Sequence, residues 1–250
     1  MAHVAAVIAS THHPFYYRAS TATGDDRPPF ADEWVAKIEA FRQTLTRARP
    51  DVLVMVGSDH FHQIWLDNMP QFLIGKAPFY DGNYYNEERE FGLPRMFMPG
   101  HEELSGYLLR EGIDAGFDLA FSNELRVDHS ITCPLITLRP ATDLPIVPVY
   151  TNIFAPPMPQ PKRFVELGKT IRRLVEAWPS DQRVATSAPV TCRWSWAGRG
   201  SSARTAPTRS STARRSAGSR RATWSPRWPR SAWTACGCPA TPLTASWTSC

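Results

Sequence analysis

The chain has 250 residues, with 28 Lys and Arg against 23 Asp and Glu, and its net charge of +5 would ordinarily indicate a nucleic-acid or membrane-surface partner. These averages conceal a break after Thr186, because all 23 carboxylates and all 7 histidines precede Ser187. Residues 1–186 hold 18 Lys and Arg, which gives this body a net charge of −5, so no basic partner-binding face is implied on it.

The distribution of cysteine and of apolar runs predicts a soluble, cytoplasmic protein. Cys133 is the only cysteine of the body, which argues against a disulfide framework. The N-terminus has no basic leader and no small-residue cleavage site, and nowhere do about 18 apolar residues run together. We therefore expect no membrane-spanning segment and a reducing compartment.

Between residues 3 and 186, apolar runs of strand length alternate with segments of helical period, the pattern of an α/β domain with a central mixed sheet flanked by helices. The first strand, Val4 to Ala9, runs into a polar loop. Asp32 is expected to cap a helix that Pro50 ends. Residues 76–100 are expected to form a long loop that covers or contacts a substrate. The other predicted elements are strands at 52–56, 72–74, 117–121, 144–150 and 183–186, and helices at 102–110 and 164–178.

Two histidines follow two of the predicted strands. His12 lies in the polar loop after the first strand, and His60 lies soon after the strand at 52–56. We expect the two strands to be neighbours, and ligands of open α/β sheets bind at the carboxyl ends of the strands. A single histidine is more often a satisfied surface or core residue, but two at adjacent strand ends favour a site. Two histidines and one carboxylate make a metal centre that keeps positions open for other ligands.

Three segments carry a resemblance to a known family. They are Ser10-Thr11-His12-His13-Pro14, Ser58-Asp59-His60 after an apolar strand, and Val127-Asp128-His129 followed by Cys133-Pro134-Leu135. In order and spacing they resemble the class III extradiol ring-cleaving dioxygenases, of the protocatechuate 4,5-dioxygenase β-subunit type. The resemblance extends over residues 3–186, which makes it more specific than any one motif.

The resemblance implies a site and a reaction. His12 and His60 would bind Fe(II), and His129 would lie beside the substrate and hydrogen-bond an oxygen of the diol or one derived from dioxygen. The substrate would be a catechol-type aromatic ring, cleaved with O2 beside its hydroxyl groups. Whether a second copy of the chain or a partner subunit completes the enzyme stays open. The remaining residues of these motifs are expected in lesser roles: Asp59 and Asp128 as supporting or loop-capping groups, His13 and His62 without a direct role, and His3 and His101 at the surface.

The tail after Thr186 departs from this family. The resemblance implies a histidine general base in a Gly-rich turn soon after Arg183 and a glutamate ligand further on, and this chain has neither at those places. Residues 187–250 lack Asp, Glu, Lys and His yet hold 6 of the 9 Trp, a composition from which no globular domain packs. The gene can also be read in a shifted frame, in which each codon consists of the third base of one present codon and the first two bases of the next. From Thr186 onward this frame allows Val-Gly-Thr-Gly-His, which is the missing turn.

We therefore divide the chain into a partial extradiol dioxygenase catalytic domain at 1–186 and a low-complexity Arg/Ser/Trp-rich tail at 187–250. The tail is interpreted as read out of frame and is not expected to fold natively, so the chain as written should be inactive. Two alternatives stay open. A metal-dependent hydrolase of the same fold would use the two histidines to polarise water. A nucleic-acid-binding protein would use the Arg-rich tail, against which the acidic body argues.

Overall fold

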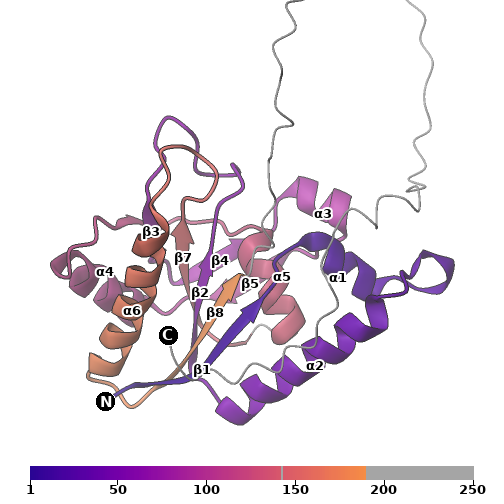
Figure 1. The fold of residues 1–250 in the computed structure, drawn as a ribbon, viewed down its shortest axis with the longest axis horizontal. Coiled ribbons are helices and arrows are strands. Elements are labelled where there is room, and N and C mark those ends of the chain that lie inside the picture. The colour runs from indigo at the N-terminus through magenta and orange to yellow at the C-terminus, as the bar shows by residue number, and fades with distance from the viewer. Residues whose placement is uncertain (142, 190–250) are drawn as a thin grey trace, which may run out of the picture. The chain divides into compact units, whose positions relative to one another are not determined.

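The computed structural model describes residues 1–141 and 143–189, which form an α/β fold around a six-stranded sheet (Figure 1). The strand order is β1-β8-β2-β7-β3-β6, and the only antiparallel pair among these strands joins β7 to β3. The predicted mixed sheet is therefore confirmed. The strands are β1 (His3–Ser10), β2 (Val52–Gly57), β3 (Phe72–Gly75), β6 (Ala120–Ser122), β7 (Ile146–Thr151) and β8 (Arg183–Pro189).

Helices cover both faces of the sheet, and each face has its own core (Figure 1). Along β2, Val52 and Val54 pack with α4 and α6, whereas Leu53 and Met55 face α2 and α5. This explains why β2 is a continuous apolar run, since a central parallel strand is buried on both sides. The helices are α1 (Pro14–Thr21), α2 (Ala31–Ala48), α3 (Tyr85–Phe91), α4 (Glu102–Asp114), α5 (His129–Leu138) and α6 (Pro161–Ala177), with a short 3-10 turn at Gly24–Asp26.

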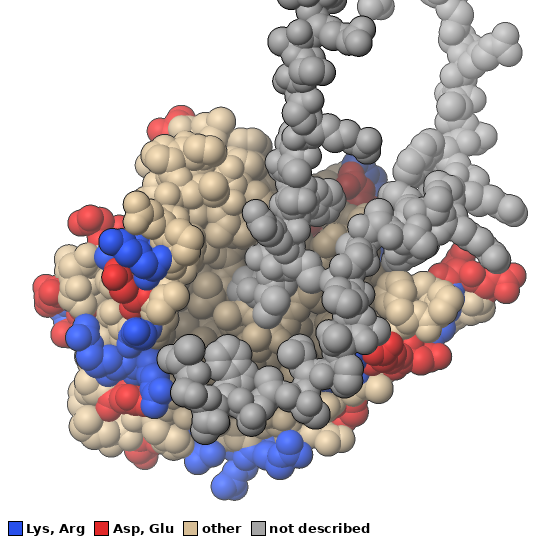
Figure 2. All heavy atoms as spheres, in the orientation of Figure 1, with Lys and Arg blue, Asp and Glu red and all other residues tan. Residues whose placement is uncertain are grey.

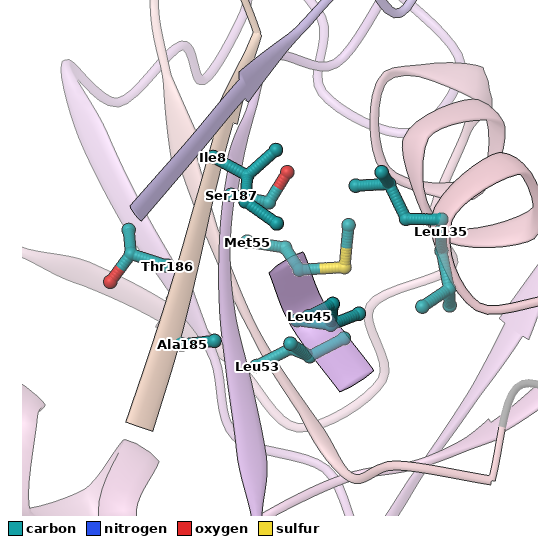
Figure 3. Close-up of a pocket in the computed structure, with 9 residues that line it drawn as sticks. Ile8, Leu45, Leu53, Met55, Leu135, Ala185, Thr186 and Ser187 are labelled. Carbon is teal, nitrogen blue, oxygen red and sulfur yellow. The ribbon is translucent and has the colours of Figure 1, made fainter. Parts of the chain in front are cut away.

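The core between the sheet and the α2/α5 pair is less completely filled. Figure 3 shows a small gap there, with Leu45 of α2 and Leu135 of α5 facing Leu53 and Met55 of the sheet. Its other lining residues come mainly from β1 and β8. This gap belongs to the hydrophobic core and lies apart from the histidines described below.

The segment at 76–100 corrects the sequence prediction of a long loop. It contains a two-stranded antiparallel sheet, β4 (Phe79–Gly82) with β5 (Met96–Pro99), and helix α3 between them. Tyr80 and Met98 are fully buried and pack in the core, whereas Phe79, Tyr85 and Phe97 are exposed. A capping box that joins Tyr84 and Glu87 starts α3.

Three further expectations were wrong in detail. Asp32 lies in the first turn of α2 and pairs with Arg27 at 2.6 Å, while Phe30 occupies the N-cap position. The strand expected at 117–121 is limited to β6, because Phe117 is buried in the core ahead of it. The strands that carry the two histidine loops, β1 and β2, are not neighbours, because β8 lies between them.

The predicted tail begins inside β8, which runs on to Pro189, and the rest of the tail lies outside the described residues.

Charges of both signs share the exposed side of α4 and α6. Figure 2 shows basic and acidic side chains side by side on that edge of the molecule. Two of the pairs there are Arg163 with Glu166 and Arg172 with Glu176, both exposed and both of little value for stability. Among the described residues, no helix has the length and apolar character that crossing a membrane requires.

Candidate metal centre

Three histidines from separate parts of the sequence meet at the carboxyl edge of the sheet. His12 follows β1, His60 follows β2, and His129 is the first residue of α5. The rings of His60 and His129 stack with centroids 4.0 Å apart, and the His12 ring lies 5.3 Å from His60 and 5.8 Å from His129. One ligand nitrogen of each lies within 4.8 Å of the others. The structure therefore brings together the three histidines that the sequence singled out.

The intervening strand explains how this convergence is built. Since β1, β8 and β2 run parallel, their carboxyl ends reach the same edge, and the outer two strands stand about 10 Å apart at two strand spacings. Imidazole side chains from the two loops can span that interval. Pro14 starts α1 immediately after the first loop, and His13 caps this helix by accepting a hydrogen bond at Nδ1 from the Phe15 N–H. That contact takes the Nδ1 lone pair of His13.

Asp128 fixes the position of His60. Its Oδ2 accepts hydrogen bonds from the His60 backbone N–H at 3.0 Å and from Nδ1 at 2.6 Å. Because an ionised carboxylate only accepts, the ring carries its proton on Nδ1 and leaves the Nε2 lone pair free. The other oxygen of Asp128 accepts from Ser130 and from the hydroxyl of Tyr150.

The carboxyl group of Asp128 stays ionised although it is fully buried. Burial acts to raise its pKa. The hydrogen bond with His60 and the charges of His129 and His60 act in the opposite direction and have the larger effect, so the pKa falls well below its ordinary value. The expectation that Asp128 supports a neighbouring histidine agrees with these contacts.

His129 has a carboxylate partner of its own. Oε1 of Glu87 accepts from the His129 backbone N–H at 2.8 Å and from Nδ1 at 2.5 Å. Burial lowers the pKa of His129, but the hydrogen bond with Glu87 and nearby carboxylates outweigh it, so the net shift is upward. The sequence analysis missed Glu87, because it assigned the segment that holds this residue to a loop.

His12 differs from the other two because Nδ1 of its ring is buried and has no hydrogen-bond partner among the described residues. Burial and the neighbouring histidines lower the pKa of His12 to about 4. The ring is therefore neutral near pH 7, and its nitrogen lone pairs are not blocked by protonation.

This shift predicts acid sensitivity that depends on His12. Its folded pKa lies below the unfolded value of 6.5, so the unfolded state binds the proton first and stability falls as the pH drops from 6.5 towards 4. The loss attributable to His12 should reach about 3 kcal/mol near pH 4, from a shift of about 2.5 units. Urea denaturation at several pH values should show that His12→Gln removes this component. His3→Gln, at an exposed histidine, should leave it unchanged.

Asp59 and His62 lie beside the three histidines. Asp59 accepts hydrogen bonds from the backbone N–H groups of His62, Gln63 and Ile64, so it caps the loop that follows His60, in agreement with the sequence expectation. The ring of His62 stacks on Tyr84, with Nδ1 3.9 Å from Asp128. A second group that could hold an ion consists of Asp59, His62 and Asp128.

An aromatic side chain borders the histidines on the side of β7. The ring of Phe154 lies 4.8 Å from that of His60 and is 40% exposed. Asn152 fixes its loop by accepting from the backbone N–H groups of Phe154 and Ala155. His101, expected at the surface, instead caps α4 and contacts Gln182.

Comparisons with known proteins find similar sequences over most of the described residues. A family model described as the catalytic LigB subunit of aromatic ring-opening dioxygenase matches residues 6–188. A 2,3-dihydroxyphenylpropionate/2,3-dihydroxicinnamic acid 1,2-dioxygenase of Azotobacter vinelandii is 31% identical over 141 residues, which cover 56% of this chain and 41% of that protein. The protein of the same name from Photorhabdus laumondii is 29% identical over 182 residues, which cover 71% and 52%.

The chain spans about half the length of these curated relatives. Among solved structures, an uncharacterized protein from Escherichia coli K12 is similar with a TM-score of 0.46 at 17% identity, and the match covers 73% of this chain and 58% of that one.

Proposed function

The chain belongs to the LigB family of aromatic ring-opening dioxygenases, and from that premise we propose that its domain is built for extradiol cleavage of a catechol-type ring with Fe(II) and O2. The observation that carries the proposal is the convergence of His12 and His60, which follow two parallel strands inside the matched region. The relatives' names, which specify dihydroxylated aromatic acids, support a diol substrate. Neither the hydrolase nor the nucleic-acid alternative gains support from these matches.

The donor set fits a divalent transition metal. Imidazole nitrogens suit iron, and the buried unpartnered Nδ1 of His12 together with the fixed tautomer of His60 leaves nitrogen lone pairs at the cluster. Within residues 1–141 and 143–189, the two carboxylates nearest the rings, Asp128 and Glu87, are already engaged by histidines. We therefore assign His12 and His60 as the metal ligands, and two protein ligands alone should hold Fe(II) weakly.

Fe(II) bound there would provide a common binding point for a diol and dioxygen and would pass electrons from the diol, which is oxidised, to dioxygen, which is reduced. The protein's own part is positioning. His12 and His60 hold one side of the site, and His129, beside them, hydrogen-bonds an oxygen of the reacting diol through Nε2. Phe154 restricts access of water on the side of β7. The histidine base and the glutamate ligand implied by the sequence resemblance cannot come from residues 187–250 as written, because that part of the chain contains neither His nor Glu.

We further propose that the tail from residue 187 is read out of frame and that the chain as written lacks ring-cleavage activity. The family match supports this interpretation, because it ends at residue 188, beside the change in composition after Thr186.

Removal of the charge on Asp128 should weaken metal binding. In Asp128→Asn, the amide must direct its N–H groups either at the N–H groups of His60 or at Ser130 and Tyr150, and in both cases the ring of His60 loses its charged acceptor. We expect the affinity of the 250-residue chain for Fe(II), measured anaerobically by competition with a chelator, to fall about 10- to 100-fold. Asp67→Asn, at an exposed loop residue, is the matched control and should retain the original affinity. Equal affinity of both variants would contradict the assignment of His60.

A further inference from the structure

We propose that Glu87 is a positioning residue that fixes both the tautomer and the orientation of His129, so that Nε2 is the nitrogen this histidine presents to a substrate. The catalytic meaning of the inference rests on the proposed function, but the geometry behind it does not. Glu87 belongs to the described residues that no sequence motif singled out.

The burial of Glu87 requires an explanation. Its side chain is completely buried on α3, and a buried carboxylate without partners is strongly unfavourable. Its one ion-pair partner among the described residues is His129. No Lys or Arg of the described part neutralises it. Among the described residues, the carboxyl group of Glu87 therefore acts on a single imidazole.

The hydrogen bonds of Glu87 hold it rigidly. Oε2 accepts from the backbone N–H of Tyr84 at 2.7 Å, which completes the capping box of α3. Oε1 accepts from both the backbone N–H and the Nδ1 of His129. The carboxylate is thus fastened to its own helix on one side and to the first residue of α5 on the other, so the imidazole cannot rotate without breaking a charge-assisted hydrogen bond.

The same arrangement occurs a second time in the site. A single oxygen of Asp128 accepts from the backbone N–H and the Nδ1 of His60, as a single oxygen of Glu87 does from His129. The two rings that are held in this way stack on each other with centroids 4.0 Å apart. Two independent carboxylates therefore set the tautomers of adjacent histidines, one assigned to the metal and the other to the substrate.

This geometry assigns a chemical role to each nitrogen of His129. Nδ1 carries a proton that it donates to Glu87, so Nε2 carries the lone pair in the neutral ring and can exchange a proton with an oxygen placed beside it. An anionic partner on the far nitrogen orients the ring in the same way as the aspartate of a serine protease triad orients its histidine. Without Glu87, either nitrogen could face the substrate.

The test is nitrogen NMR of the histidine rings in the metal-free 250-residue chain, at a pH where the imidazoles are neutral. We expect the Nδ1–H form of His129 to dominate by about tenfold or more, the reverse of the preference of free histidine. In Glu87→Gln the amide must direct an N–H either at Tyr84 or at His129, and the dominance should fall about tenfold. Glu90→Gln makes the same change on the exposed side of α3 and should have no effect.

A structural role alone would leave the tautomer unchanged in Glu87→Gln, and that result would overturn the proposal. A dominant Nε2–H form of His129, or an even mixture of the two forms, in the unchanged chain would overturn the proposal as well. The measurement on the unchanged chain therefore decides the question even if Glu87→Gln does not fold. Because the measurement needs neither metal nor substrate, it is independent of ring cleavage. Failure of Fe(II) binding or of turnover would contradict the proposed function and leave the role of Glu87 standing.

Discussion

Insertion of one base between the second and third positions of codon 186 is expected to convert an inactive chain into a ring-cleaving dioxygenase. The insertion brings the Gly-rich turn with its histidine back into frame, along with the sequence beyond it. Loss of a general base typically lowers a rate by about 10²- to 10⁴-fold, and weakened metal binding adds to that loss. Oxygen consumption and the absorbance of the ring-opened product, with a catechol as substrate, measure the restoration.

The matched control is the insertion of two bases at the same point. It lengthens the gene in the same region but leaves the downstream sequence in the third, unrelated frame, so we expect no turnover. Catechol cleavage by the unchanged 250-residue chain would contradict the out-of-frame interpretation. An inactive one-base product that nevertheless folds and binds Fe(II) would count against extradiol cleavage as the function of the domain.

In the frame-restored protein, His129→Asn should lower kcat by about 10²- to 10³-fold while bound iron stays unchanged. The magnitude is that of removing one preorganised hydrogen-bonding group from a developing charge. Asparagine is chosen because its amide can still donate to Glu87, which avoids leaving a buried carboxylate without a partner. Steady-state kinetics together with metal analysis check both parts of this expectation.

Metal analysis separates two roles for His129. Its nitrogen lies close enough to those of His12 and His60 for all three to hold one ion. If His129→Asn loses iron along with activity, His129 is a ligand and its assignment beside the substrate is wrong. If iron and kcat are both retained, it has neither role. His3→Asn removes an exposed histidine and should alter neither quantity.

The sequence predicted the parts of this fold that depend on local pattern. Apolar runs of strand length located β1, β2 and β7, and the loops that follow two of them identified His12 and His60. The order of the strands in the sheet could not be predicted, because every buried parallel strand has the same apolar pattern. The position of β8 between β1 and β2 depends on pairing between segments that are distant in the sequence. The segment at 76–100 was misread because its Gly, Pro and Asn residues interrupt every apolar run, so the short elements β4, α3 and β5 leave no periodic pattern.

Of the two carboxylates that hydrogen-bond the histidines, the sequence indicated only one. Asp128 was expected as a supporting or loop-capping group, but the sequence does not show that its carboxylate contacts His60 rather than the adjacent His129. Glu87 is 42 positions away from His129 in the chain, and nothing in its surroundings distinguishes it from the exposed acidic residues of the same helix. Only the packing of α3 against α5 brings the two together.

The place of β8 between β1 and β2 has a consequence for engineering. Its last residue, Pro189, pairs with Ser10 at the edge from which both histidine loops emerge, so β8 ends between the two strands that carry the proposed ligands. Short peptides grafted after Pro189 would start within reach of the centre. A library of such grafts rich in His, Asp, Glu and Cys would supply new metal ligands, while His12 and His60 would be the same two ligands in every member.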